Sequence, residues 1–391
     1  MEERRANSPP PRRKATTGEW LIAFPELRER GFRRPIGRAE RFFSFGAVAL
    51  LVLFAVGWSW SIARAHAAGD EGVTPATATI TTALTDASAP SVAYLTGAAL
   101  TALATPARGE SGKLRARIQP AGSPITPILA DTLPPGAVAK FSSGAAAEST
   151  ATLAAPRRPG IWSLALKIGN AMKPLADFSV ITLRPAAEER GGRLGLYFIG
   201  SWPAARKGQR GVSYAPPTGF IEVTPQTQNT QLSEHFRLKD FLPHDQQNIW
   251  PKYIVLDMKL IDKDELVLQD LKDHGINPAG VRVMSGFRTP QYNAGGGDPR
   301  GRAALSRHMY GDANDIFIDN DGNGQMDDLN HDGRVNIADA KVIQDAVNRV
   351  ERAHPSLIGG CGIYSGTSAH GPFTHIDTRG YPARWIGTGD S

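Results

Sequence analysis

The feature that most constrains the fold is an uncharged apolar run near the N-terminus, residues 42–63, with the sequence FFSFGAVALLVLFAVGWSWSIA. A helix of this length can cross a hydrocarbon core of about 30 Å. Arginines crowd the flank before the run and acidic residues follow it, so the positive-inside rule predicts a cytoplasmic N-terminus. A cleaved signal peptide is the alternative, because Ala65-His66-Ala67 fits a small-residue cleavage site. The length of the run and of the region before it favours an uncleaved transmembrane helix, with the rest of the chain outside the cytoplasm.

The positive charge of the chain is concentrated before this run. The formal net charge is +6, and residues 1–41 alone hold 11 Lys/Arg against 6 Asp/Glu. No basic patch with interleaved aromatic residues remains elsewhere, so no nucleic-acid partner is expected. The single cysteine, Cys361, excludes an intrachain disulfide, and we expect it to be a small buried apolar residue.

Composition divides the remaining chain. Residues 68–112 are rich in Ala, Thr, Pro, Ser and Gly, which is typical of a flexible tether. Apolar residues then alternate with small or polar ones in 161–166 and 178–183, which predicts half-buried strands, and Pro-Gly punctuation between strands indicates an all-β, immunoglobulin-like sandwich. The predicted organisation is a basic cytoplasmic tail (1–41), a transmembrane helix (42–63), a flexible linker (64–114), a β-sandwich module (115–185), a β-rich connector (186–231) and a C-terminal domain (232–391).

The C-terminal domain begins with a helix and a strand. Leucines recur at roughly helical spacing between residues 253 and 273, and Gly275-Ile276-Asn277-Pro278 ends the run. The strand 281–284 follows and leads into Ser285-Gly286-Phe287-Arg288-Thr289-Pro290.

Two short stretches of this domain, 306–315 and 371–377, supply metal-binding side chains. Zinc in hydrolytic sites takes three protein ligands and keeps a fourth position for water, and His308, Asp315 and His375 form a suitable set. Asp315 opens the apolar run 316–318 and His375 lies in another β-like run, so two strands could hold these ligands side by side. Asp377 shares a strand face with His375 and would orient a ligand or contact the bound water.

Taken together, these motifs resemble the zinc D-Ala-D-Ala carboxypeptidases and the related murein endopeptidases, phage endolysins and hedgehog-like folds. The resemblance is carried by Ser-Gly-Phe-Arg-Thr-Pro followed by Tyr292-Asn293, by Ser-x-His-x-x-Gly-x-Ala-x-Asp at 306–315, and by the late His-x-Asp at 375–377. It covers the C-terminal domain only, and implies an α+β zinc peptidase fold with a small antiparallel sheet. It also implies a zinc site at the three residues above and substrate contacts at Ser285, Tyr292 and Ser306. Arg288 would bind a substrate carboxylate or stabilise the oxyanion.

The function implied is hydrolysis of peptide bonds in peptidoglycan, by an enzyme held in the bacterial inner (cytoplasmic) membrane with its C-terminal domain periplasmic or extracytoplasmic. Many members of the family carry a general base two or three residues before the last ligand, where this chain has Phe373 and Pro372. His370 and Asp377 are the alternatives here. A catalytically inactive cell-wall-binding or scaffold protein with the same metals is the second hypothesis for the function.

An acidic insertion, residues 319–339, separates the second and third zinc ligands and repeats the spacing of calcium loops. The pattern fits at Asp319, Asp321, Asn323 and Asp327, and again at Asp328, Asn330, Asp332, Asn336 and Asp339. The second match resembles a dockerin-type or EF-hand loop and runs into a predicted helix, 338–353. We therefore expect bound Ca²⁺ with a structural role. A dockerin-like interaction module is a further alternative, although only one loop with its helix is evident.

Overall fold

The computed structural model describes residues 109–125, 137–144, 146–150, 154–168, 170–295, 302–368 and 370–387, all of which belong to one compact unit. The predicted tail 1–41, the predicted transmembrane helix 42–63 and nearly all of the linker lie outside these residues. Within the described part of the chain, no helix is both long and apolar enough to cross a membrane.

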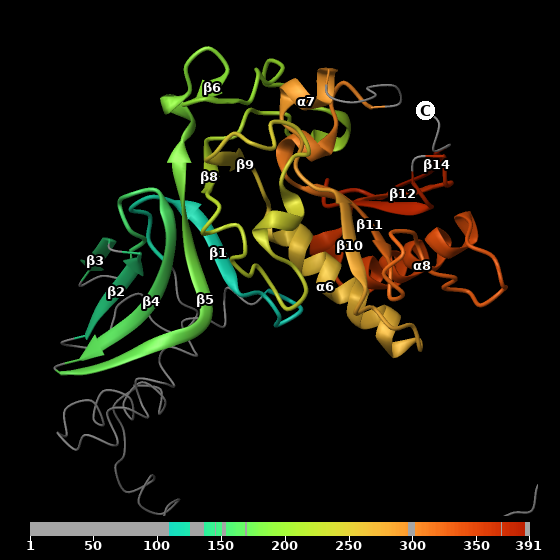
Figure 1. Ribbon diagram of the computed structural model, residues 1–391, viewed down its shortest axis with the longest axis horizontal. Helices are drawn as coiled ribbons and strands as arrows, with labels where there is room; N and C mark the ends of the chain where they lie inside the picture. Colours follow the sequence, from blue (N-terminus) through green and yellow to red (C-terminus); the bar gives the residue numbers. More distant parts are fainter. Residues whose placement is uncertain are drawn as a thin grey trace, which may run out of the picture. The chain divides into compact units, whose positions relative to one another are not determined.

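A seven-stranded sheet is built from the first half of the described residues (Figure 1). Its strand order is β3-β2-β4-β5-β8-β9, and β1 pairs with β5 in parallel. The strands are β1 (Ala116–Pro120), β2 (Ala137–Ser143), β3 (Ala146–Thr150), β4 (Gly160–Ile168), β5 (Ala171–Pro185), β8 (Gly219–Val223) and β9 (Lys252–Ile254). Alternation along β4 buries Trp162, Leu164 and Leu166 in one apolar cluster.

A two-stranded ribbon, β6 (Arg193–Leu194) with β7 (Tyr197–Phe198), forms the second sheet. Short 3₁₀ helices connect the strands in this half of the chain: η2 (Ala186–Glu188), η3 (Gln209–Gly211) and η4 (Leu238–Phe241).

The third sheet has five strands in the order β10-β11-β13-β12-β14. They are β10 (Val281–Ser285), β11 (Ala313–Ile318), β12 (Gly360–Tyr364), β13 (Phe373–Asp377) and β14 (Ala383–Gly387). All neighbours are antiparallel except β12 and β14, which run parallel. The sheet is therefore mixed.

Two helices cover one face of this sheet, α6 (Met258–Asp273) and α8 (Ile337–Ala353), and they also contact each other. The side chain of Asp257 caps α6 by accepting a hydrogen bond from Lys259 N, and Asn336 with Asp339 forms a capping box at the start of α8. The remaining helices are α7 (Pro290–Gly295), η5 (Arg307–Tyr310) and η6 (Pro355–Leu357). Because the helices take one face, side chains that alternate to the other face are available for a site.

The predicted fold class is wrong. The described residues are mostly β, arranged in three sheets with few helices, and the C-terminal sheet is mixed where a small antiparallel sheet was expected. The predicted β-sandwich is part of a single sheet, because the end of β5 pairs with β8, at Arg184 with Phe220. Turn residues in the sequence mark where strands end, but they do not specify which strands pair, and β5 continues unbroken for 15 residues.

Candidate functional site

One row of residues crosses the five-stranded sheet on the face opposite the helices. Ser285 on β10 is paired with Asp315 on β11, and Asp315 with His375 on β13. His375 is paired in turn with Gly362 on β12, and Gly362 with Trp385 on β14. Because paired residues in neighbouring strands present their side chains to the same face, these five positions form a continuous line.

His308 reaches this row from the 3₁₀ helix η5, which precedes β11. The turn between them is made by Gly311, whose φ of 73° lies in the left-handed region. A Cβ at that position would come within 2.4 Å of the Val255 carbonyl group, so only glycine fits. The backbone of Gly311 also accepts a hydrogen bond from Asp257 N at 2.8 Å, which ties η5 to the start of α6.

Three ligand atoms converge at this point, and all three side chains are buried. His308 Nε2 lies 3.1 Å from His375 Nδ1 and 3.3 Å from Asp315 Oδ1, and the last two atoms are 2.9 Å apart. Nitrogen and oxygen ligands about 2.0–2.1 Å from a tetrahedral zinc ion are separated by about 3.3 Å. The donor set and its spacing therefore fit zinc.

The outer atoms of all three side chains are also bonded. Nδ1 of His308 donates to the Gly286 carbonyl at 2.7 Å, and Nε2 of His375 lies 3.2 Å from Asp377 Oδ2. Asp315 Oδ2 accepts a hydrogen bond from Arg288 Nη2 at 2.7 Å. Such outer partners fix the tautomer of each histidine, so that the lone pairs point at one another.

The charges of His308 and Asp315 suit a cation, whereas His375 tends to hold a proton. Burial lowers the pKa of His308 to about 4, and the Arg288 guanidinium acts in the same direction, so this imidazole is neutral. Burial disfavours the carboxylate of Asp315, but His308, His375 and Arg288 outweigh it and hold its pKa well below the usual range. Burial likewise opposes the imidazolium of His375, but hydrogen bonds to Asp315 and Asp377 raise its pKa. Binding of a metal would therefore compete with a proton at His375.

The two residues expected as alternative bases have different surroundings. Asp377 is fully buried, and its carboxylate accepts hydrogen bonds from Gly360 N, Arg379 N and the Arg379 guanidinium in addition to facing His375. His370 is half-buried, its Nδ1 lies 2.8 Å from the Gly371 carbonyl oxygen, and its ring meets Phe373 edge-on at 5.2 Å.

The three expected substrate contacts lie on three different elements. Ser285 lies in the row and its Oγ accepts a hydrogen bond from Arg288 Nε at 2.8 Å. Tyr292 is on α7, where the Arg302 guanidinium lies 4.7 Å from its ring centre. Ser306 is buried at the N-cap of η5, two residues before His308.

The sequence interpretation missed an aromatic group beside the metal ligands. Trp385 lies 5.2 Å from the His375 ring, and its Nε1 donates to Tyr364 Oη at 2.8 Å. Tyr364 stacks on Phe373 at 4.5 Å. A Cβ on Gly362 would come within 2.3 Å of the Trp385 indole, so the absence of a side chain there lets the indole lie against the histidine. Alternation along β12 and β14 was the only signal for this arrangement.

The two predicted calcium loops also differ. Asp319, Asp321 and Asp327 bring carboxylate oxygens within 4.8 Å of one another. Among the described residues, the carboxylates of the second loop form no such group. Asp339 is fully buried and accepts backbone hydrogen bonds from Leu329, Asn330 and Asn336, so it caps α8.

Comparisons with protein-family models, curated proteins and solved structures found no match to this chain.

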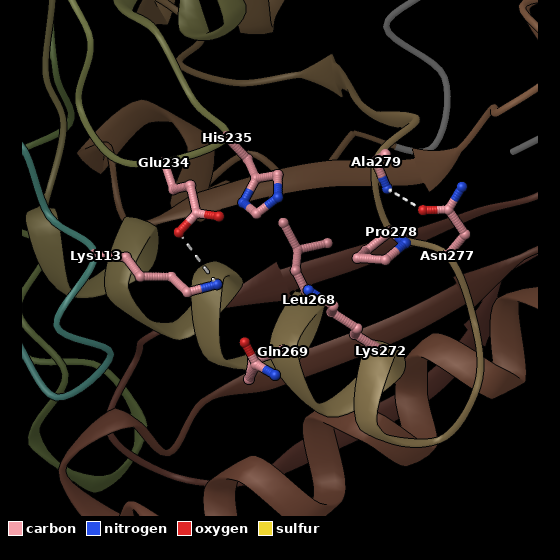
Figure 2. Close-up of a pocket in the computed structure, with 9 residues that line it drawn as sticks. All are labelled: Lys113, Glu234, His235, Leu268, Gln269, Lys272, Asn277, Pro278 and Ala279. Atoms are coloured by element: carbon pink, nitrogen blue, oxygen red, sulfur yellow. Dashed lines mark hydrogen bonds and ion pairs between the residues drawn. The ribbon is translucent and has the colours of Figure 1, made fainter.

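A pocket elsewhere in the molecule is a weaker candidate for a functional site. It has a volume of about 120 Å³ beside α6 and is lined by none of the three ligands. Figure 2 shows Glu234 paired with Lys113 on one side and Asn277 bonded to the Ala279 backbone on the other, with Leu268 between them. Among the residues that line it, His235 Nδ1 lies 2.8 Å from Glu265 Oε2 and Gln269 Nε2 donates to Asp273 Oδ1. None of the lining residues belongs to a metal-binding cluster found among the described residues.

Proposed function

We propose that this chain is a zinc-dependent peptidase that hydrolyses peptide bonds in peptidoglycan. The observation that carries the metal assignment is the convergence of His308 Nε2, Asp315 Oδ1 and His375 Nδ1 at tetrahedral spacing, with every outer atom already bonded. The substrate class is supported by the motif resemblance alone. The extracytoplasmic location inferred from the sequence stays a prediction.

Zinc held by these three residues would supply an activated water at neutral pH and polarise the scissile carbonyl. Arg288 is placed to receive the substrate, because its side chain is 15% exposed and its guanidinium is fixed by Asp315 and Ser285 through Nη2 and Nε. The donors on Nη1 would face a substrate carboxylate or the oxygen that gains negative charge. A fixed, planar donor suits both tasks better than a mobile ammonium group.

His370 is the better placed of the two alternative bases. With Nδ1 held by the Gly371 carbonyl, the imidazole keeps Nε2 as its basic nitrogen. Asp377 has its lone pairs directed at Arg379, Gly360 and His375, which leaves it the role of positioning His375. In this scheme His370 takes the proton of the attacking water and later returns it to the leaving amine.

Because the carboxylate of Asp377 is fully hydrogen-bonded, it is not free to act as a base. This favours one alternative function, a cell-wall-binding protein that holds zinc but does not hydrolyse a substrate. The two functions are separated by purifying the full chain, measuring its zinc content and incubating it with isolated peptidoglycan. A peptidase releases new amino groups at a rate that falls to background in H308A and after chelation, and zinc restores only the wild-type protein. H274A, which removes an exposed histidine at the end of α6, is the matched control and should retain full activity.

Activity that survives both H308A and chelation would refute the zinc assignment. One zinc ion per chain without any release of amino groups would refute the peptidase and support the binding protein.

A further inference from the structure

We infer that Asp319, Asp321 and Asp327 form a calcium site at the end of β11, a site that is separate from the zinc ligands and does not depend on the proposed peptidase function. Asp319 directly follows the last residue of β11, and Asp327 N donates to the Ile318 carbonyl at 2.8 Å. This hydrogen bond closes the loop at its base and makes Asp319 and Asp327 neighbours. Between them, Gly322 and Gly324 take φ values of 74° and 83°, which turn the chain sharply back.

The strongest indication that this loop binds a cation is the side chain of Asp319. Its side chain is 3% exposed, yet its Oδ1 is a buried oxygen without a hydrogen-bond partner. The other oxygen, Oδ2, accepts a hydrogen bond from Gly324 N at 3.2 Å and lies 3.5 Å from Arg282 Nε. A buried carboxylate oxygen with no donor is unfavourable, and a cation would satisfy it.

The spacing of the three carboxylates matches a calcium coordination sphere. Ligand oxygens lie about 2.3–2.6 Å from calcium, so two ligands of one ion can be up to roughly 5 Å apart. The three side chains offer oxygens within 4.8 Å of one another. Asn323 Oδ1 and the backbone carbonyl of Gln325 occupy positions five and seven of the loop, where calcium loops supply further oxygens.

Electrostatics favours a divalent cation over an empty loop. Three carboxylates lie close together, and the one cationic side chain in an ion pair with them among the described residues is Arg282, which is 57% exposed and therefore screened by solvent. An all-oxygen set of ligands suits calcium better than magnesium, which requires near-octahedral geometry and keeps several waters.

The site is also held in place before any ion binds. Asp319 N donates to the Gly280 carbonyl, and Gly280 N donates to Asn320 Oδ1, so the start of the loop is fixed to the turn before β10. At the other end, Met326 is buried to 1% exposure in the main core. Little chain entropy would be lost when calcium binds to a loop restrained in this way.

The second loop is a natural internal control. The carboxylate of Asp328 accepts hydrogen bonds from Asp332 N and Gly333 N, and Asp339 is engaged at the helix cap. Neither residue has an unpartnered buried oxygen. The two loops share the sequence pattern, but among their described carboxylates only Asp319 in the first loop has a buried oxygen without a hydrogen-bond partner.

The test is a calcium titration of the zinc-loaded full chain. Calorimetry measures the heat of binding, thermal unfolding measures the melting temperature, and magnesium is titrated in parallel. The wild-type protein is expected to bind calcium with a melting temperature that rises with calcium concentration. D319N should weaken calcium binding by roughly tenfold or more, because one ligand charge is removed. D321N should do the same, and since Asp321 is exposed and bonds only to Asn323, this variant should fold normally.

D328N, in the second loop, should bind calcium like the wild-type protein. Absence of a calcium-dependent heat and of a melting shift in the wild-type protein would overturn the site. An unchanged affinity in D321N, or a loss in D328N equal to that in D321N, would also overturn it. Loss of peptidase activity with calcium binding intact would refute only the proposed function.

Discussion

Asp264 is a buried acid that should make the stability of this protein fall as the pH rises. The residue lies on α6 with no exposed surface, and its Oδ2 accepts a hydrogen bond from Asn314 Nδ2 at 2.7 Å. Its Oδ1 and the Oδ1 of Asn314 are both buried without partners. Burial raises the pKa of Asp264 to about 8, although the hydrogen bond from Asn314 and the charge of Lys263 act in the opposite direction. The folded protein therefore keeps this carboxyl group protonated at neutral pH.

The sign and size of the effect follow from proton linkage. In the unfolded chain an aspartate has a pKa of about 3.9, so between about pH 4 and pH 8 the folded state holds a proton that the unfolded state has released. The stability supplied by the neutral acid is complete below pH 4 and is lost as the pH rises to about 8. Each pH unit in this window costs at most about 1.4 kcal/mol, which amounts to about 4 kcal/mol between pH 4 and pH 7.

D264N should remove this dependence, since an amide stays neutral and can still accept the hydrogen bond from Asn314. Urea unfolding of the metal-free protein from pH 4 to pH 8 measures it, with stability differences from the wild-type protein compared at each pH. We expect similar stabilities near pH 4 and a variant that is more stable by up to about 4 kcal/mol at pH 7. D273N, which removes an exposed carboxylate from the end of the same helix, controls for the change in net charge. A difference that is constant with pH, or a variant that is less stable at pH 7, would refute the reasoning.

Three further variants test the metal site. D377N should lower zinc affinity by about 10–100-fold, because His375 loses the carboxylate that orients it. Competition with a chelator measures the affinity, and an unchanged value would show that Asp377 has no positioning role. R288K should lower kcat by about 10²–10³ while the zinc content stays at the wild-type value, because an ammonium group cannot reproduce the planar set of donors on the guanidinium. Full activity in this variant would show that Arg288 has no role in the mechanism. G362A should destabilise the fold by about 1–3 kcal/mol and change the tryptophan fluorescence, because the added Cβ displaces Trp385 from His375. G295A, where a Cβ meets open space, is the matched control, and equal melting temperatures for the two variants would contradict the steric argument.

The sequence predicted local elements well where a periodic pattern was strong. The strands expected at 161–166, 178–183 and 281–284 lie within β4, β5 and β10, and the helix expected at 338–353 is α8. The fold class was wrong because it depended on how strands pair. β5 is long enough to pair with β4 at one part and with β8 at its end, which joined segments that composition had separated. Pairing is decided by contacts between residues far apart in the chain, and these are not visible in local patterns.

The candidate site, like the fold, was only partly predictable from the sequence. Histidine and aspartate types at motif spacing were enough to nominate the three ligands, but the sequence could not indicate that Trp385 lies against His375 or that Lys263 is buried. Lys263 donates to Glu351 Oε1 and to the Asp377 carbonyl oxygen, so a fully buried lysine of α6 supports the strand that carries a ligand. A charged residue within a helix is normally expected on the exposed face. Only its partners, which lie far away in sequence, make the buried position favourable.

β11 connects the separate features of the domain. Alternation along this strand directs Asn314 towards Asp264 under the sheet and Asp315 towards the ligands above it, and the strand ends where Asp319 begins the proposed calcium loop. Because adjacent residues of a strand share one backbone, a shift caused by ionising Asp264 would also move Asp315. A cation at Asp319 would fix the far end of the same strand. The neutral acid beneath the sheet and the proposed cation at its edge would therefore act on the same strand that carries Asp315.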